Sequence, residues 1–151
     1  MLPINLFFDS SALIAGIISE RGAARVLLLL AEDRRIEISV SEQVIVEVER
    51  NIAKNIPKIL PLMREFIRET NLTIQKDPSR EEVHEHLNWI KHLADVPILV
   101  SAVKTQVDFL VTLNTKHFLD DPEVTLRSGS RIGTPDDALT WVRQQMTAIG
   151  E

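Results

Sequence analysis

Oxygen-bearing side chains stand where several predicted structural elements of this chain begin or end. Asp9 directly follows the apolar run of residues 6–8, and Asn114 follows a second apolar run, residues 109–112. Asp95 stands where a predicted helix begins. Carboxylate and amide oxygens are the ligands that hard divalent cations such as Mg²⁺ and Mn²⁺ prefer. The pattern therefore indicates a metal site, and with it chemistry that uses an ion-activated water.

Glu47 adds a further carboxylate, in the second turn of a helix predicted to begin after Ser41. Taken singly, each acid has an ordinary explanation, because Asp9 and Asp95 suit helix N-caps and Glu47 suits a solvated helix face. Taken together, they lie near the carboxyl ends of predicted strands, where a parallel sheet gathers its ligand-binding loops. Carboxylates that meet there would repel one another unless a cation lay between them.

Strands alternate with helices along the chain, which predicts a parallel sheet covered by helices on both faces. The helices within residues 41–93 form a long run, which we expect to protrude from the sheet as an arm. The predicted strands are residues 6–8, 36–40, 72–74, 109–112 and 131–133. The predicted helices are residues 11–18, 23–32, 41–55, 58–69, 79–93, one that begins at 95, 115–119 and 134–146.

The bulk composition fits one domain, residues 1–151, with an aliphatic core. Hydrophobic residues make up 44% of the chain but aromatic residues only 5%, and there is no cysteine for a disulfide or a thiolate metal site. The chain begins without a basic targeting segment and has no apolar run long enough to span a membrane, so we expect a cytoplasmic protein. The formal net charge of −5 argues against an extended nucleic-acid-binding surface, so RNA contact needs local basic side chains, a metal ion or a basic partner.

Other chemistries find less support in the sequence. His84 and His86 are two residues apart on a predicted helix and do not share a face. His92 and His117 have no partners at metal-ligand spacing, and there is no glycine-rich phosphate loop or nucleophile elbow. A phosphotransfer domain with an aspartyl nucleophile would carry a second Asp two residues after the first, whereas Asp9 is followed by two serines.

Several segments resemble the PIN domain family in their order and spacing: FFDSSALIAGI, VSEQVIVEVERNI, DVPILVSAVKTQVDFLVTLNTKHF and RIGTPDDAL. They span essentially the whole chain, and they look most like the VapC-type toxin ribonucleases of toxin–antitoxin pairs. The resemblance implies a three-layer α/β/α sandwich with a short parallel sheet. It also implies Mg²⁺- or Mn²⁺-dependent endoribonuclease cleavage of RNA, an antitoxin protein as partner, and a homodimer.

The resemblance assigns roles to the candidate residues. Asp9, Glu47 and Asp95 align with the acidic metal ligands of the family. Thr112 matches the small hydroxyl residue before its last acid. Asn114 stands where many members carry a fourth Asp, so we expect one tightly held ion, with Asn114 still at the catalytic site. The neutral amide also keeps an alternative open: a catalytically weak or inactive PIN fold that binds RNA or acts as a scaffold.

Further residues are expected to support such a site. Ser10 and Thr112 would hold ligands or waters in a second layer around the ion. Phosphate contacts would come from basic side chains near the acidic cluster, because lysine and arginine supply most of the affinity for a nucleic-acid backbone. The expected RNA-binding residues are Arg21, Arg25, Lys104 and Lys116.

Overall fold

The strands of the computed structural model form one parallel sheet. The structure describes residues 3–118 and 120–148, apart from the side chain of Thr115. Within them, five strands pair in parallel in the order β3-β2-β1-β4-β5. All correspond to strands predicted from the sequence: β1 (Asn5–Phe8), β2 (Glu37–Ser41), β3 (Thr73–Gln75), β4 (Phe109–Val111) and β5 (Ile132–Gly133).

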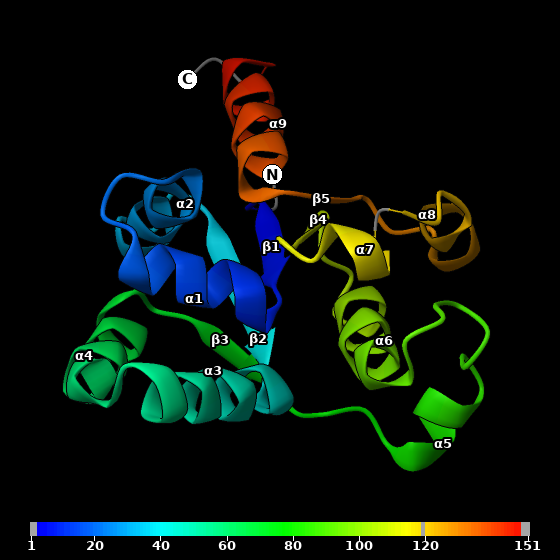
Figure 1. Ribbon diagram of the computed structural model, residues 1–151. Helices are drawn as coiled ribbons and strands as arrows, with labels where there is room; N and C mark the ends of the chain where they lie inside the picture. Colours follow the sequence, from blue (N-terminus) through cyan, green and yellow to red (C-terminus); the bar gives the residue numbers. More distant parts are fainter. Residues whose placement is uncertain (1–2, 119, 149–151) are drawn as a thin grey trace.

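Helices flank this sheet, and the predicted α/β/α architecture is confirmed. The first half of the chain contains α1 (Ser10–Ile18), α2 (Ala23–Glu32), α3 (Glu42–Asn55), the 3₁₀ helix η1 (Pro57–Ile59) and α4 (Leu60–Glu69). The second half contains α5 (Arg80–His84), the 3₁₀ helix η2 (Leu93–Asp95), α6 (Val96–Lys104), α7 (Thr115–Phe118), α8 (Glu123–Ser128) and α9 (Pro135–Ala148). Figure 1 shows α1–α4 gathered to the left of the view and α5–α8 to the right. Among the described residues, no helix is long and apolar enough to cross a membrane.

The strand order reverses at β1. The connections from β1 to β2 and from β2 to β3 step to one side, and the chain then returns to place β4 on the other side of β1. Open α/β sheets bind ligands at such a switch point, outside the carboxyl ends of the strands. Phe8 pairs with Val111, and the backbone N–H of Asp9 donates to the Val111 carbonyl at 3.1 Å. Asp9 and Thr112 therefore leave the sheet next to each other.

The central strands are apolar along their length because both faces of the sheet are covered. Leu6, Phe7 and Phe8 of β1 are fully buried. Leu110 and Val111 of β4 are buried to the same extent. Dense packing on both faces leaves these strands little freedom to shift, so the polar residues that follow them are held in fixed positions.

The predicted protruding arm is not formed. α3 packs against α1 and α4, and its apolar stripe of Val44, Val48 and Ile52 is fully buried. Met63 of α4 is also buried, and β3 completes one edge of the sheet. Residues 41–75 therefore belong to the core, because the amphipathic faces of α3 and α4 bury more apolar surface there than they would in an extended arm.

Two other helix predictions also need correction. The capping box of Ser79 and Glu82 is present, but the helix predicted to reach residue 93 ends at His84. Beyond it, the backbone N–H of His86 donates to the Val83 carbonyl, so the chain tightens into three-residue turns. α8 was not predicted, and it ends at Gly129, whose φ of 69° is the left-handed conformation that favours glycine at a helix end.

Candidate metal centre

Asp9 lies at the switch point and is held by hydrogen bonds on both carboxylate oxygens. Oδ1 accepts from the backbone N–H of Ala12 at 2.9 Å, so Asp9 caps α1, and also from the hydroxyl of Ser11 at 2.7 Å. Oδ2 accepts from the hydroxyl of Thr112. The residue is only 3% exposed. Burial raises the pKa of Asp9, these hydrogen bonds oppose the rise, and the nearby charge of Asp95 adds to it.

Two hydroxyl groups join the start of α1 to the segment that follows β4. Thr112, which is fully buried, donates to Asp9 and accepts from the backbone N–H of Asn114 at 2.9 Å. Ser11 donates to Asp9 and accepts from the backbone N–H of Leu113 at 2.9 Å. The position of the Asp9 carboxylate is therefore fixed from both strands of the switch point.

Glu47 approaches the same region from α3 and is half-buried. Its Oε2 accepts from the hydroxyl of Ser10 at 2.9 Å, and its Oε1 accepts from the side chain of Gln43 at 2.7 Å. Gln43 also donates to the Ala94 carbonyl at 3.3 Å, which connects α3 to η2. Glu47 is thus held on the side of α3 that faces α1 and Asp95, whereas the single-residue argument favoured a solvated face.

Asp95 does not act as the helix cap that the sequence predicts. Its backbone is helical, with φ −93° and ψ −12°, because η2 runs directly into α6, and its side chain makes no capping hydrogen bond. The carboxylate instead faces His117, whose Nδ1 lies 2.5 Å from Oδ2. Burial raises the pKa of Asp95, the His117 charge opposes this, and the Glu47 charge adds to the rise.

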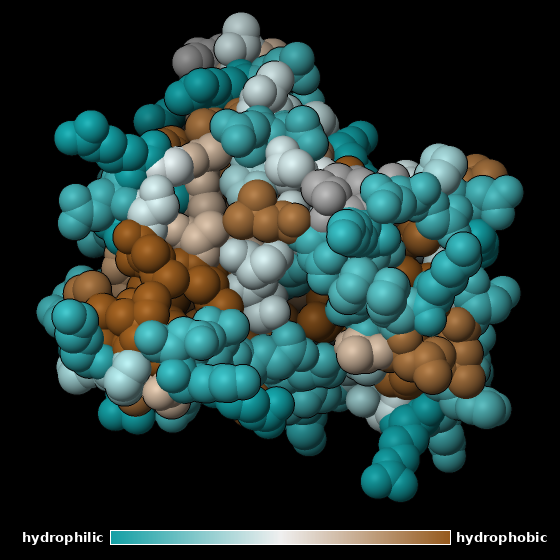
Figure 2. Space-filling model, in the orientation of Figure 1, coloured by the Kyte–Doolittle hydropathy of each residue, from teal (hydrophilic) through white to brown (hydrophobic). Residues whose placement is uncertain are grey.

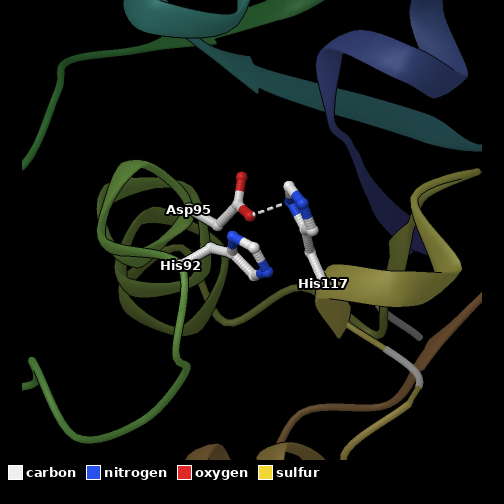
Figure 3. Close-up of side chains that lie close together, drawn as sticks. All are labelled: His92, Asp95 and His117. Carbon is white, nitrogen blue, oxygen red and sulfur yellow. Dashed lines mark ion pairs between the residues drawn. The ribbon is translucent and has the colours of Figure 1, made fainter.

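His92, Asp95 and His117 form a compact group of possible metal ligands (Figure 3). Their donor atoms all lie within 4.8 Å of one another, and the two imidazole rings stack with centroids 3.5 Å apart. The prediction that these histidines lack partners at ligand spacing is wrong. His92 and Asp95 are three residues apart across a 3₁₀ turn, where such positions share a face, and His117 joins them only through the fold.

Asn114 reaches this group through His117. Its Nδ2 lies 2.7 Å from Nδ1 of His117, and its backbone N–H is bound by Thr112. The residue therefore sits beside the acidic cluster, at the end of β4. Its neutral amide adds no charge there.

Two of the four basic side chains expected to bind RNA are engaged elsewhere. Arg25 donates to the carbonyls of Gly16 and Ile17 at 2.7 and 2.9 Å, and its guanidinium covers the ring of Phe66, so its role is structural. Lys104 pairs with Glu82 at 3.0 Å, at the opposite end of α6 from Asp95. The length of that helix separates Lys104 from the acidic cluster by roughly 13 Å.

The remaining two basic residues are exposed. Arg21 follows the end of α1 that is distant from Asp9, whereas Lys116 lies on α7 next to His117. Of the four expected RNA-binding residues, Lys116 is therefore the one that the fold brings beside the acidic cluster.

The donor set fits a divalent cation. Ionised carboxylates offer about four lone pairs each, and the described hydrogen bonds use three on Asp9 and two on Glu47. All of these donors are neutral, so the hydrogen bonds leave the negative charges of Asp9 and Glu47 uncompensated. Oδ2 of Asp95 is buried and accepts no well-directed hydrogen bond, despite its ionic contact with His117. Burial is the main cause of the raised pKa values of Asp9 and Asp95, and repulsion between the acids adds to it; a cation bound among these oxygens would offset both effects.

A model of the PIN domain matches residues 5–116, and the chain belongs to the PIN domain family. PIN domains are a nuclease fold, and they typically use divalent metal ions. Among curated protein sequences, none matches the chain significantly.

Solved structures share the fold at low sequence identity. PAE2754 from Pyrobaculum aerophilum aligns with a TM-score of 0.65 and 15% identity, over 93% of this chain and 96% of that one. VapBC2 from Rickettsia felis, solved bound to a DNA fragment from its promoter, gives a TM-score of 0.62 and 18% identity, over 87% of this chain and 98% of that one. The sarcin–ricin-loop-cleaving toxin VapC20 of Mycobacterium tuberculosis gives a TM-score of 0.52 and 12% identity, over 70% of this chain and 86% of that one.

Proposed function

We propose that this protein is an endoribonuclease that depends on Mg²⁺ or Mn²⁺, with the ion held by Asp9, Glu47 and Asp95. The proposal is supported chiefly by hydrogen bonds that join the surroundings of these acids: Thr112 donates to Asp9, Ser10 beside it donates to Glu47, and Gln43 donates to both Glu47 and the carbonyl of Ala94, next to Asp95. A bound divalent ion would supply an activated water and would offset charge on the phosphoryl oxygens.

The chain's own residues would position this ion and the phosphodiester. Thr112 and Ser11 orient Asp9, while Ser10 and Gln43 orient Glu47. Such supporting contacts matter because a ligand that is free to rotate binds an ion less tightly. Asn114 and Lys116 would complete the site, the amide through its oxygen and the ammonium through a phosphate contact.

The biological setting is proposed from the fold neighbours. Two of them carry VapC-type names, and one was solved as a VapBC assembly. We therefore propose a toxin of a toxin–antitoxin pair, with an antitoxin protein as partner and a cytoplasmic RNA as substrate.

A homodimer belongs to the same proposal. Figure 2 shows apolar side chains gathered over the region of α1 and α4, and the exposed large hydrophobic residues there include Ile18 and Leu62. We expect Ile18→Glu to shift the protein toward monomer in sedimentation experiments. Leu126→Glu, at an 81% exposed position on α8, is the matched control. A parent that is monomeric at all concentrations would contradict this part of the proposal.

The nuclease proposal is tested with the purified full chain and an end-labelled single-stranded RNA. Cleavage should require Mn²⁺ or Mg²⁺ and stop in EDTA, and Asp9→Asn should abolish it. Asp136→Asn is the control, because Asp136 is an exposed acid on α9. Equal cleavage by Asp9→Asn would place the activity elsewhere. A parent that binds RNA but never cuts it would favour the alternative of an inactive PIN fold, which Asn114 keeps open.

A further inference from the structure

We propose that His92, Asp95 and His117 form a binding site for a transition-metal ion such as Zn²⁺ or Co²⁺. This site goes beyond the proposed nuclease function, because it requires neither Asp9 nor Glu47. It shares Asp95 with the acidic cluster and adds two imidazole nitrogens.

The polar groups around His117 cannot all be paired by hydrogen bonds within the protein. Nδ1 lies 2.5 Å from Oδ2 of Asp95 and 2.7 Å from Nδ2 of Asn114. One ring nitrogen offers either one proton or one lone pair. If it donates to Asp95, the amide N–H of Asn114 has no acceptor there; if it accepts from Asn114, two lone pairs face each other. If the amide of Asn114 were turned over, its oxygen and Oδ2 of Asp95 would both have to accept from the single N–H at Nδ1 of His117.

A cation would accept the lone pairs of Nδ1 and Oδ2 that otherwise face each other, provided that the amide of Asn114 turns its oxygen toward the ion. Oδ2 of Asp95 is buried and accepts no well-directed hydrogen bond, so a lone pair is available to an ion. Figure 3 shows this carboxylate beside a ring nitrogen of His117, with the His92 ring next to both. Two ligands that each lie about 2.1 Å from an ion are at most about 4.2 Å apart. The 4.8 Å limit on the donor atoms is close to this distance, and the stacked rings, whose planes differ by 19°, would have to tilt so that both in-plane lone pairs meet at one ion.

The donor types select the ion. Two imidazoles and one carboxylate are a ligand set of zinc enzymes and of other transition-metal sites, and they leave coordination positions open for water or a phosphate oxygen. Mg²⁺ favours oxygen ligands and keeps much of its own water. The group should therefore prefer Zn²⁺ or Co²⁺ to Mg²⁺.

The backbone holds this group in place before any ion binds. The 3₁₀ turn of η2 sets the spacing of His92 and Asp95, and ring stacking keeps His92 close to His117. The segment that leads into His92 is anchored by Arg127 of α8, which donates to the carbonyls of Asn88 and Trp89. Ligand residues that are already held close together lose less conformational entropy when an ion binds.

The test is a titration of the chelator-treated full chain with Co²⁺, followed by its visible absorption, with Zn²⁺ and Mg²⁺ as competitors. We expect one Co²⁺ per chain, displaced by stoichiometric Zn²⁺ but not by millimolar Mg²⁺. His92→Gln and His117→Gln should each weaken binding by about tenfold or more, since even loss of a residue that supports a ligand costs about 10- to 100-fold. His84→Gln, at an exposed position on α5, is the matched control and should bind as the parent does.

The Asp9→Asn variant separates this inference from the nuclease proposal. It should lose metal-dependent RNA cleavage but keep the Co²⁺ spectrum. If Asp9→Asn removes the spectrum while both histidine variants keep it, the ion lies among the carboxylates and the inference is overturned. Displacement of Co²⁺ by Mg²⁺ as readily as by Zn²⁺ would also overturn it. A parent without nuclease activity would leave the Co²⁺ result unaffected, and His92 is exposed, so its variant should fold normally.

Discussion

The hydroxyl of Thr112 donates a hydrogen bond to the carboxylate of Asp9, and both side chains are buried between the ends of two adjacent parallel strands. Because the same hydroxyl accepts from the backbone N–H of Asn114, one side chain sets the position of an acid and of the turn beside it. The contact makes Thr112 a positioning residue for the proposed metal site.

Replacing Thr112 by Val should separate this role from packing. The two side chains have the same shape, but Val leaves Oδ2 of Asp9 and the N–H of Asn114 without this partner, at a cost of about 2 kcal/mol of unfolding free energy. Metal affinity, measured as the rise in melting temperature with Mn²⁺, should fall about tenfold. Thr112→Ser keeps the hydroxyl and should lose only about 1 kcal/mol, with a normal metal response. Equal metal responses in both variants would show that the hydrogen bond does not orient Asp9 for an ion.

Stability without metal should depend on pH through Asp9 and Asp95. Their pKa values are raised above the ordinary 3.8, chiefly by burial, so the native state holds these protons more tightly than the unfolded chain does. The free energy of unfolding should therefore fall as the pH rises from the ordinary pKa through the raised pKa values of Asp9 and Asp95. The loss is complete once the pH exceeds the raised pKa values. Urea unfolding in EDTA should show a smaller loss over this range in Asp9→Asn than in the parent.

Addition of Mn²⁺ should oppose that loss, because the ion competes with protons for the same oxygens. The control is Asp136→Asn, whose pH dependence should match that of the parent. A parent and an Asp9→Asn variant with superimposable profiles in EDTA would mean that Asp9 is not destabilising in its ionised form.

Asn114→Asp tests the departure from the family's acidic pattern. The substitution is nearly isosteric and places a full charge beside His117 and Asp95. Mn²⁺ affinity should rise by about tenfold through added charge attraction, and cleavage should need less Mn²⁺. Without metal the variant should melt at a lower temperature, because like charges are brought together. Cleavage curves and EDTA melts that superimpose on those of the parent would place residue 114 outside the metal centre.

RNA binding should weaken with salt along a shallow slope. Arg25 and Lys104 are engaged in protein contacts, and the chain carries a net charge of −5, so few cations can reach phosphates at once. About two to four contacts give a slope of roughly −1.4 to −2.8 in a log–log plot for single-stranded RNA. Anisotropy titrations with Asp9→Asn, which should bind without cutting, provide the measurement. A slope near −6 would reveal a basic surface that these residues do not explain.

Short sequence patterns predict the helices and strands that contain their own capping or terminating residues. Asp9 and Ser41 cap the helices that follow them, and Ser79 forms the predicted capping box. β1 and β4 were readable because strands buried on both faces are continuously apolar. These features depend on a few neighbouring residues, so a single sequence contains them.

Features that depend on the tertiary fold could not be predicted from the sequence. Asp95 has the residue type and position of an N-cap, but η2 continues into α6 and leaves its carboxylate for His117. The pairing of His92 with His117 joins segments on either side of α6 and β4, so no spacing rule reveals it. Arg25 has the charge of an RNA contact, yet the free carbonyls at the end of α1 bind it first.

The acids of the proposed site come from separate crossover connections of the sheet, since Asp9 follows β1, Glu47 lies after β2 and Asp95 lies after β3. Thr112, which orients the first of them, arrives only after β4. During synthesis, a growing chain therefore has no assembled site until β4 has left the ribosome and paired with β1. Any fragment that ends before residue 112 lacks the contact that positions Asp9, so truncated products of this chain should be inert.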